Sequence, residues 1–392
     1  MIRVLFAIGS LHGGGSERQT VGILRHLDRS KFAPLLYLVT RGGELLSDVP
    51  DDVAVFAFHD HAPLPRFNWP GRIHRAEMRD LARVIRDERI DVVYDRTWHM
   101  TLLTAAAARR ERVRRISTVV TNPRLDFERN APRFAWIKTR MLRRAYREAD
   151  RVVAVSEGVR SAVSEYHGLP LERIATIYNF VDLERIDHLA AEACGSELTW
   201  AAAGRFTIVA AGRLSEEKGF QYLLSAMDEL VHRRGRAHVL VRLLGNGPLE
   251  HTLRAFVERR GLAEHVRFEG FQPNPYVFFR SADLYCLPSV YEGMPNALVE
   301  AMACRVPVVA ADCESGPREI LAGGEHGRLV PPGDPQALAD AIEDAMDHPA
   351  AWRGRIESAR RRVEEAFSLP AGMAKIQDLL VSVCSAEGRA KP

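Results

Sequence analysis

Short apolar runs alternate with longer amphipathic stretches along the chain, and this alternation restricts the fold more than any other feature. Continuous runs of valine, isoleucine and leucine are typical of parallel strands buried on both faces, and the amphipathic stretches are the helices that connect such strands. The pattern predicts an α/β fold. The predicted strands form two series, 4–8, 35–39, 53–57, 92–94, 116–120 and 152–155, followed by 206–210, 239–243, 266–268, 284–287 and 306–310.

Two series of strands indicate two doubly wound, Rossmann-like domains, which also suits a chain of 392 residues. We expect the first domain to span residues 1–182 and the second to span 205–370. The strand pattern lapses over 183–204, so this stretch is predicted to be a linker. A final helix is predicted at about 371–385, after the "SLP" break at 368–370.

Charge is spread unevenly over the two halves of the chain. The net charge of +3 gives no indication of a protein that binds polyanions over its whole surface, and no nucleic-acid partner is expected. Residues 1–180, however, contain 30 Lys and Arg against 21 Asp and Glu, and the remaining residues contain 24 against 30. The basic half suggests a phosphate-rich partner or surface, and ordinary charge scatter is the alternative.

The cysteine pattern and the hydropathy favour a cytoplasmic protein. The five cysteines show no Cys-x-x-Cys spacing and are expected to be reduced. No apolar run reaches the length needed to cross a bilayer. The opening "MIRVLFAIGS" has too short an apolar stretch for a signal peptide and runs into a glycine-rich turn, so we interpret it as the first buried strand.

Two loops place glycines or basic residues just before a helix. In "GSLHGGGSERQT" (9–20), Gly13 to Gly15 would let the backbone approach a ligand at the free N–H groups of the next helix. In "AGRLSEEKGFQYLLSAM" (211–227), Arg213 and Lys218 flank a strand-to-helix turn, where open α/β sheets bind ligands. Neither the dinucleotide fingerprint nor a P-loop is present. A structural turn and two solvated charges are the alternatives.

The stretch "SVYEGMPNALVEAMACRVPVV" (289–309) reads as a loop followed by a helix. Pro295 is predicted in the first helical turn. Asn296, Ala297 and Leu298 would then offer unpaired backbone N–H groups, which suit a diphosphate.

Two glutamates of this stretch complete the pattern. Glu300, one turn into the helix, could accept hydrogen bonds from a ribose, and Glu292 would face whatever the diphosphate carries. Alone, two glutamates at this spacing are more often surface acids. Combined with Arg213 and Lys218, they predict a site for a sugar nucleotide, in which cations bind phosphate and acids bind hydroxyl groups.

The stretch "YEGMPNALVEAMA" resembles the Glu-x7-Glu motif of the family 4 retaining glycosyltransferases. The GT-B fold of this family has two Rossmann-like domains facing a central cleft. The resemblance covers nearly the whole chain, because further motifs follow in the family's order and spacing. These are "GGGSER", "VSEGV", "IYNFVDL", "GRLSEEKG", "GNGPLEHTL", "FEGF", "SADLYCLPS" and "GRLVPPGD".

The resemblance implies roles for the residues already singled out. Arg213 and Lys218 would bind the donor diphosphate, Glu300 the ribose, and Glu292 the hydroxyl groups of the transferred sugar. The rest of the turn would also bind the donor, through Gly293, Met294, Pro295, Asn296 and Ala297.

The resemblance also implies contacts from elsewhere in the chain. Phe271 would lie by the nucleobase. Gly14 and Gly15 would close over the donor from the first domain, and His99 would stand beside the donor sugar and the acceptor as a second catalytic residue with Glu292. The last helix would pack back on the first domain.

Two departures from the family pattern stand out. Arg305 occupies a position where the family commonly has glycine, so its turn must change conformation or tolerate strain. The "DRTW" before His99 lacks the common His-x-His pair, and a structural histidine is the alternative there.

The implied reaction is transfer of a hexose or N-acetylhexosamine from a nucleotide-sugar, UDP favoured and GDP open, with retention at the anomeric carbon. We expect a front-face reaction rather than a double displacement on Glu292, because the two glutamates serve different parts of the donor. No cofactor is expected. No metal is expected either, since Asp-x-Asp is missing and the Arg and Lys pair already neutralises the phosphates.

Two basic stretches bear on the acceptor, "RRERVRR" (109–115) and the amphipathic 131–151, which contains Phe134, Trp136 and Met141. The second suits an anionic membrane surface or a lipid diphosphate. By this hypothesis the enzyme elongates a polyprenyl-diphosphate-linked glycan in bacterial polysaccharide assembly and sits peripherally on the cytoplasmic face of the membrane. A solvated helix packed on the sheet is the alternative.

Other functions fit parts of the pattern. A nucleotide-sugar epimerase or a glucan synthase would share the fold. A nucleotide-sugar-binding protein without turnover would not need the intact set of Arg213, Lys218, Glu292 and Glu300. A dehydrogenase is the weakest alternative, because the dinucleotide fingerprint is missing.

Overall fold

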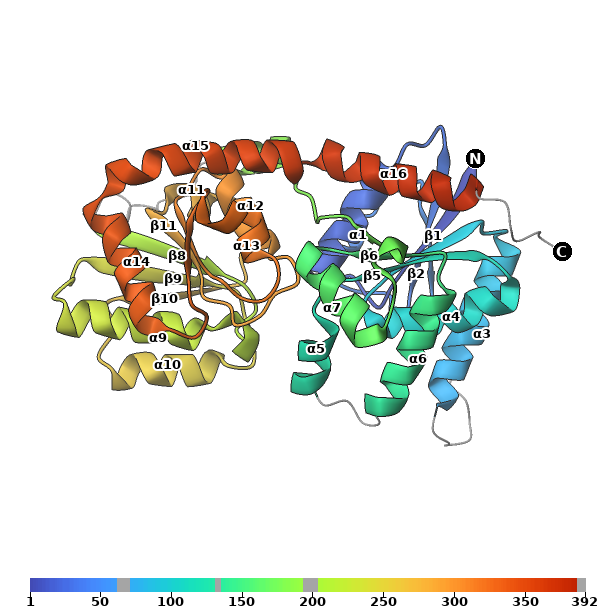
Figure 1. Cartoon of the computed structure of the whole chain (residues 1–392), viewed down its shortest axis with the longest axis horizontal. Helices are drawn as coiled ribbons and strands as arrows, with labels where there is room; N and C mark the ends of the chain where they lie inside the picture. Colours follow the sequence, from blue (N-terminus) through green and yellow to red (C-terminus); the bar gives the residue numbers. More distant parts are fainter. Residues whose placement is uncertain (62–70, 131–134, 193–203, 386–392) are drawn as a thin grey trace. The chain divides into compact units, whose positions relative to one another are not determined.

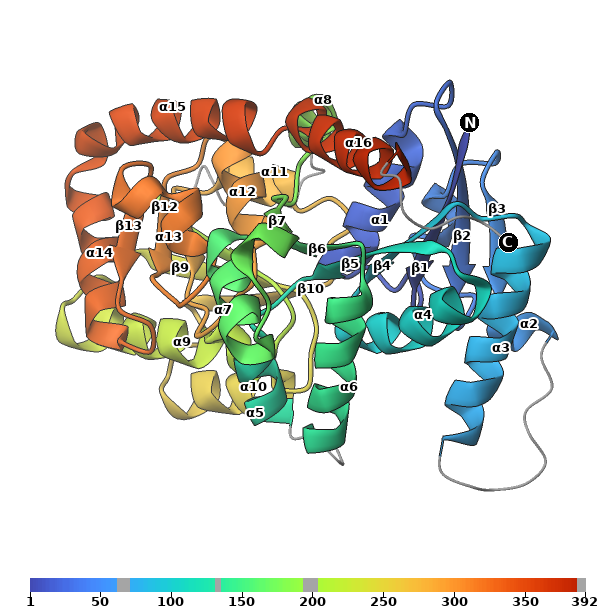
Figure 2. The ribbon, with the colours of Figure 1, turned by 45° about the vertical axis from the view of Figure 1, so that its right-hand side comes forward.

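The computed structural model describes residues 1–61, 71–130, 135–192 and 204–385 (Figure 1). The chain divides into two compact units, the first made of Met1–Asn179 with the C-terminal segment from Pro370, and the second of Phe180–Leu369. Each unit contains one parallel sheet with helices packed on it (Figure 2). The predicted fold of two doubly wound α/β domains is confirmed. That the two units face a shared cleft, and that one serves the acceptor and the other the donor, stays a prediction.

In the described part of the first unit, seven parallel strands lie in the order β3-β2-β1-β4-β5-β6-β7. In the central strand β1, all residues from Val4 to Ile8 are buried, so its apolar residues run on without alternation. The strands are β1 (Ile2–Ile8), β2 (Phe32–Leu38), β3 (Ala54–Ala57), β4 (Val92–Arg96), β5 (Arg114–Val119), β6 (Arg151–Ala154) and β7 (Ile174–Thr176).

The helices of the first unit are α1 (Gly15–His26), α2 (Phe58–His61), α3 (Arg72–Asp87), α4 (Trp98–Glu111), α5 (Pro123–Asn130), α6 (Ala135–Glu148), α7 (Glu157–His167) and α16 (Leu369–Ser385). On one face of the sheet, Leu5 and Val93 pack in a single core with Leu81 and Ile85 of α3 and Leu103 of α4. The helices pack an apolar face on the sheet, which explains why their sequences are amphipathic.

In the described part of the second unit, six parallel strands lie in the order β10-β9-β8-β11-β12-β13. They are β8 (Phe206–Ala211), β9 (Val239–Leu244), β10 (Val266–Gly270), β11 (Leu284–Leu287), β12 (Val308–Ala311) and β13 (Arg328–Val330). The helices are α8 (Leu183–Ala191), α9 (Phe220–Asp228), α10 (Glu250–Arg259), α11 (Tyr276–Ser281), α12 (Asn296–Ala303), α13 (Pro317–Ile320), α14 (Pro335–Asp347) and α15 (Pro349–Ala366).

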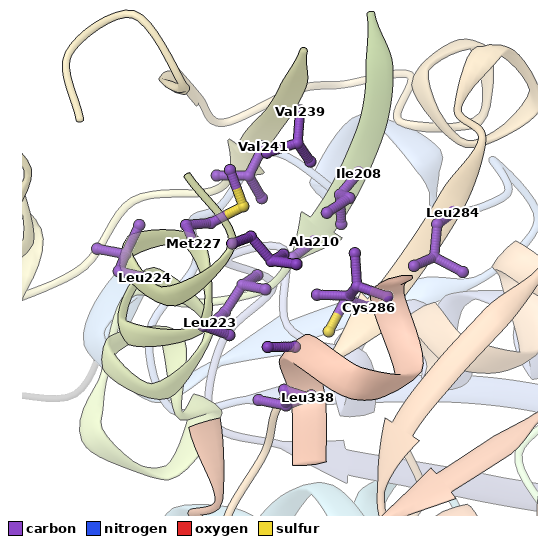
Figure 3. Close-up of a cluster of buried hydrophobic side chains, with 14 of the residues drawn as sticks. Ile208, Ala210, Leu223, Leu224, Met227, Val239, Val241, Leu284, Cys286 and Leu338 are labelled. Atoms are coloured by element: carbon purple, nitrogen blue, oxygen red, sulfur yellow. The ribbon is translucent and has the colours of Figure 1, made fainter. Parts of the chain in front are cut away.

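Figure 3 shows one side of the core of the second unit. Ile208 of β8, Val241 of β9 and Cys286 of β11 point toward Leu223 and Met227 of α9, and all five side chains are buried. The sheet is thereby fixed against the helix that follows β8, and the loop between them starts and ends on rigid elements.

Part of the stretch expected as a linker is helical. Asp182 caps α8 by accepting a hydrogen bond from the Arg185 N–H at 3.0 Å. The Arg360 guanidinium of α15 donates to both carboxylate oxygens of Asp187, at 2.9 and 2.7 Å. Helix α8 thus belongs to the second unit. The rest of that stretch, 193–203, lies outside the described residues.

The last helix, α16, begins at Leu369, two residues before the predicted start, and Pro370 lies in its first turn, where proline is tolerated. The Asp28 N–H donates to the side-chain oxygen of Gln377 at 2.9 Å, and the Lys375 ammonium lies 5.7 Å from the centre of the Tyr178 ring. These contacts attach α16 to the first unit.

The structure shows how the turn at Arg305 accommodates an arginine where the family commonly has glycine. It has a φ of 59°, in the left-handed region, and its N–H donates to the Met302 carbonyl at 3.1 Å. The turn therefore keeps the conformation that suits glycine and tolerates a strain of roughly 1–2 kcal/mol.

Candidate functional site

The strongest candidate site lies at the carboxyl edge of the sheet in the second unit. Strand β8 pairs with β9 on one side and with β11 on the other, so the chain order reverses at β8. In open α/β sheets, ligands bind outside the carboxyl ends of the strands at such a switch point. The loops after β8 (212–219) and after β11 (288–295) both leave the sheet there.

These two loops contact each other directly. The Val290 N–H donates to the Glu217 carbonyl at 2.8 Å. Gly219 has a φ of 66°, and a Cβ added to it would lie 2.0 Å from the Pro288 carbonyl oxygen. Only glycine permits this approach, which brings the residues of both loops together.

The central contact of the site joins Lys218 and Glu292. The Lys218 ammonium donates to Glu292 Oε1 at 2.7 Å, and the Ser289 hydroxyl donates to the same oxygen, also at 2.7 Å. The side chain of Lys218 is 25% exposed and that of Glu292 is 8% exposed. A nearly buried carboxylate therefore has a cation that a ligand can still reach. Ser289 was not predicted, although it stands three residues before Glu292 at the end of a strand.

Glu300 lies close to the same cluster. It is buried in α12, one turn from the helix start. Burial raises the pKa of Tyr285 on β11 well above its ordinary value, and the carboxylates of Glu292 and Glu300 raise it further. Both glutamates thus act on one buried phenol. Tyr285 was not predicted as part of the site, because in the sequence it reads as one more apolar strand residue.

The start of α12 differs in detail from the prediction. Pro295 is the N-cap, in extended conformation, and the helix begins at Asn296. The Leu298 N–H donates to the Pro295 carbonyl at 3.2 Å, so the expectation that it is unpaired is wrong. Gly293, Met294 and Pro295 are buried, while Asn296 and Ala297 are half-buried.

Arg213 and Phe271 are solvent-accessible members of the site. Arg213 is exposed, and no ion pair to it is found within the described ranges. Phe271 follows β10 and is 47% exposed, the state in which an aromatic ring can stack on a planar ligand. The Leu214 N–H donates to the Asn246 carbonyl at 3.0 Å and the Gly245 N–H to the Gly270 carbonyl at 2.7 Å, so the loops after β8, β9 and β10 are tied together.

A third loop, after β12, was missed as part of the site. A Cβ added to Gly316, whose φ is 92°, would lie 2.7 Å from Pro295 Cδ and 3.1 Å from the Gly293 carbonyl oxygen. Burial and, to a smaller extent, the Glu292 carboxylate raise the pKa of Cys313 to about 12, and the Lys218 ammonium opposes this shift. The loop therefore packs on the turn and lies within electrostatic reach of the central ion pair.

The predicted residues of the first unit gather at the equivalent edge of their own sheet. Strand β1 pairs with β2 and with β4, Gly14 and Gly15 follow β1, and His99 follows β4. Gly14 is the N-cap of α1, and a Cβ added there would lie 2.3 Å from a carboxylate oxygen of Glu17. Whether these residues meet the donor stays a prediction.

His99 is exposed and follows Thr97, whose φ of 74° is unusual for a β-branched residue. Asp95, just before this turn, accepts hydrogen bonds from the hydroxyls of Thr101 and Thr104 at 2.6 Å each, which holds the start of α4 against β4. Burial lowers the pKa of His74, Glu77 opposes this shift, and His99 lowers the pKa further.

Two features are absent from the described ranges. No group of three or more His, Cys, Asp or Glu side chains there could hold a metal ion. Nor do those residues include a helix that combines the length and the apolar character needed to span a bilayer.

Family models match both halves of the chain. The model described as Glycosyltransferase Family 4 matches residues 13–185, and the model described as Glycosyl transferases group 1 matches residues 205–348. The chain belongs to the family 4 glycosyltransferases. The resemblance of the Glu-x7-Glu stretch and its companion motifs is thus confirmed.

Individual relatives include bacterial glycosyltransferases. The chain is 30% identical over 233 residues to the alpha-D-kanosaminyltransferase of Streptomyces kanamyceticus, covering 58% of each chain. It is 27% identical over 219 residues to the N-acetylgalactosamine-N,N'-diacetylbacillosaminyl-diphospho-undecaprenol 4-alpha-N-acetylgalactosaminyltransferase of Campylobacter jejuni, covering 56% of this chain and 57% of that one. The matches span between 36% and 58% of the length of the curated relatives.

Solved structures share the whole fold. The crystal structure of Anabaena Alr3699/HepE in complex with UDP and glucose matches with a TM-score of 0.80 and 24% identity, covering 97% of this chain and 100% of that one. This likeness shows that the fold is GT-B.

Proposed function

We propose that the protein transfers a sugar from a nucleotide-sugar, bound at the carboxyl edge of the second unit, to a glycan acceptor in bacterial polysaccharide or glycoconjugate synthesis. The observation that carries the proposal is the cluster of Lys218, Glu292 and Ser289 at the switch point of the sheet, with Arg213 exposed beside it. A UDP-sugar is the favoured donor, since the structural neighbour from Anabaena was solved with UDP and glucose.

The chemistry of a nucleoside diphosphate sugar suits the side chains of this edge. Arg213 offers a planar fork and Lys218 a point charge for the diphosphate. The turn before α12 lies at a helix N-terminus, which attracts anions. Glu300 is placed one turn further for the ribose, and Phe271 has an exposed ring for the base.

The proposed transfer is a front-face reaction with retention, in which the departing diphosphate oxygen takes the proton of the acceptor hydroxyl. Glu292 Oε1 already accepts hydrogen bonds from the Lys218 ammonium and the Ser289 hydroxyl, which suits binding of sugar hydroxyls better than nucleophilic attack. Lys218 and Arg213 would stabilise the leaving diphosphate without a metal. His99 is proposed to contact the donor sugar and the acceptor from the first unit.

Nucleotide-induced stabilisation is the test of this proposal. We expect one nucleoside diphosphate among UDP, GDP and ADP, at about 100 times its dissociation constant, to raise the unfolding free energy by about 2.7 kcal/mol. The measurement is the thermal midpoint with each nucleotide and with NAD. A response to NAD alone, or to none of the diphosphates, would contradict the proposal.

A lipid-linked acceptor is proposed because the Campylobacter relative is named for a diphospho-undecaprenol substrate and because α6 has an unusual surface. Trp136 is 72% exposed and Met141 is 44% exposed, among the basic residues of the same helix, while Leu142 and Tyr146 pack inward. The start of the predicted basic stretch, 131–134 with Phe134, lies outside the described residues. Such a helix suits peripheral contact with the cytoplasmic face of an anionic membrane.

Vesicle binding tests the membrane contact. We expect Trp136→Ala to weaken binding to vesicles that contain phosphatidylglycerol by about tenfold or more, because a large apolar side chain loses its contact with lipid. Leu171→Ala, which removes an exposed apolar side chain elsewhere in the first unit, is the control and should have little effect. Binding that ignores the anionic lipid content, or equal binding by both variants, would argue against the contact.

The alternative functions predict different products from the same donor. An epimerase would convert the nucleotide-sugar without an acceptor, a glucan synthase would elongate glucan without lipid, and a binding protein would show the thermal response without turnover. Product analysis with the donor found in the thermal screen separates these outcomes.

A further inference from the structure

The basic stretch "RRERVRR" (109–115) has no place in the proposed reaction, and the structure gives it another environment. The stretch covers the end of α4 and the start of β5, at the amino ends of the parallel strands. Gly14, Gly15 and His99 follow the carboxyl ends of β1 and β4, which is the opposite edge of this sheet. A function for the stretch must therefore be sought away from the reacting groups.

A cavity of about 350 Å³ lies at this amino edge. Its lining residues come from the end of α4, the turn after it, the start of β5 and the last residue of α6. They are Ala105, Ala108, Arg109, Arg112, Val113, Arg115 and Glu148. The volume falls at the lower end of the range of small-molecule sites, roughly 300–1,000 Å³. It suits a ligand of sugar-phosphate size.

The three arginines that line the cavity differ in how many ion pairs and hydrogen bonds they form with the protein. Arg115 is buried, ion-paired to Asp95 at 3.5 Å and hydrogen-bonded to the Ser117 hydroxyl and the Ala145 carbonyl, so it forms part of the wall. Arg109 lies 3.4 Å from Glu148 Oε2. Arg112 is exposed and has no ion pair within the described residues.

The charges of the cavity do not cancel. Glu148 accepts a hydrogen bond from Arg144 at 2.7 Å and is ion-paired to Arg109, so two arginines share its single charge. With Arg112 added, positive charge remains at the rim. Glu148 Oε2 is buried beside Arg109 and accepts no hydrogen bond in the described structure, so the carboxylate keeps acceptor capacity that no described protein donor uses.

The backbone conformation of Arg112 sets the direction in which its side chain leaves the end of α4. Arg112 is the C-cap of α4 in the left-handed conformation, with φ 55° and ψ 37°, and its N–H donates to the Ala108 carbonyl. Glycine is usual at such a position, and a larger residue is strained there. Arg89, with φ 50°, is another left-handed arginine; it lies one residue after Glu88, the C-cap of α3, and does not line the cavity. Arg89 can therefore serve as a control for substitutions of Arg112.

We propose that this cavity binds a phosphate monoester that also bears a hydroxyl group. Arg112 and Arg109 bind the phosphate oxygens, and Glu148 accepts the hydroxyl. Guanidinium forks match phosphate oxygens in pairs, and such charge-assisted hydrogen bonds are the strong ones. The site is separate from the sugar-nucleotide site in the second unit and does not depend on it.

Titration calorimetry with glucose 6-phosphate tests the proposal on the full-length protein. We expect saturable binding to the wild type and a loss of about 10- to 100-fold in affinity for Arg112→Gly, the range expected for a charge-assisted hydrogen bond. Arg89→Gly should bind as the wild type does. Both substitutions relieve a left-handed arginine, so neither is expected to impair folding. Lys218→Ala should also bind glucose 6-phosphate normally.

Vesicles that contain phosphatidic acid present the same phosphate monoester on a lipid. Binding to either probe that is lost in Arg112→Gly supports the site and identifies the source of the phosphate. Three results would overturn the proposal: no saturable binding of either probe by the wild type, equal affinities of the Arg112→Gly and Arg89→Gly variants, or loss of binding in Lys218→Ala. The last result would assign the phosphate to the donor site.

Discussion

Replacing Lys218 with alanine is expected to lower the turnover of sugar transfer about 10²–10³-fold, or about 3–4 kcal/mol, the effect of removing one preorganised donor to a developing oxyanion. Lys218 lies in the loop after β8, where its ammonium is held 2.7 Å from Glu292 and its side chain is still 25% exposed. It can therefore stabilise charge on the departing diphosphate without moving far. The measurement is kcat with the nucleotide-sugar identified by the thermal screen.

The same variant should lose nucleotide-induced stabilisation and some intrinsic stability. Glu292, 8% exposed, would keep only the Ser289 hydroxyl, and an unpaired buried carboxylate costs about 2 kcal/mol here, because the removed partner is partly exposed. Turnover must therefore be measured under conditions in which a urea unfolding curve shows that the variant is folded. Lys31→Ala is the control, since Lys31 forms a surface pair with Asp28 at 3.5 Å. Unchanged turnover in Lys218→Ala would refute the phosphate-binding role.

The sequence predicted all the interior strands of both sheets and missed one edge strand of each sheet. Strand 284–287 was predicted with its observed bounds, because a continuous apolar run leaves few alternatives. β7 (Ile174–Thr176) and β13 (Arg328–Val330) were missed, because each is three residues long and only partly buried. Short edge strands depend on their one neighbour for pairing, and the local sequence does not reveal that neighbour.

The candidate site was predicted as a set of residues but not as a set of contacts. The positions of Lys218 and Glu292 follow from strand-to-helix turns that can be read locally. Their ion pair spans 74 positions in the chain and depends on the close approach of Gly219 to Pro288, which only the folded loops define. The sequence therefore assigned Lys218 to phosphate and Glu292 to sugar, without indicating that the two side chains bind each other.

If Lys218 binds the donor diphosphate as proposed, this ion pair means that the diphosphate must share Lys218 with Glu292 or displace the carboxylate. A ligand that competes with an internal carboxylate binds more weakly than it would to the free cation. Glu292 therefore has two effects of opposite sign, since it restrains Lys218 in the empty site and is proposed to bind hydroxyl groups of the sugar. A substitution that removes only its charge separates these effects.

Glu292→Gln is accordingly expected to tighten binding of the nucleoside diphosphate severalfold while lowering sugar transfer about 10- to 100-fold, the effect of losing a charged hydrogen-bond acceptor. Glutamine keeps the size of the side chain and an oxygen for the Ser289 hydroxyl, so the loop should retain its shape.

Calorimetry with the diphosphate and kcat with the nucleotide-sugar are measured on this variant, on Lys218→Ala and on the double variant. If the pair competes as proposed, the double variant binds the diphosphate as weakly as Lys218→Ala does, because the gain from removing the carboxylate requires the lysine. Diphosphate binding that weakens in Glu292→Gln would mean that the carboxylate holds Lys218 in its binding position, and unchanged transfer would remove Glu292 from the proposed reaction.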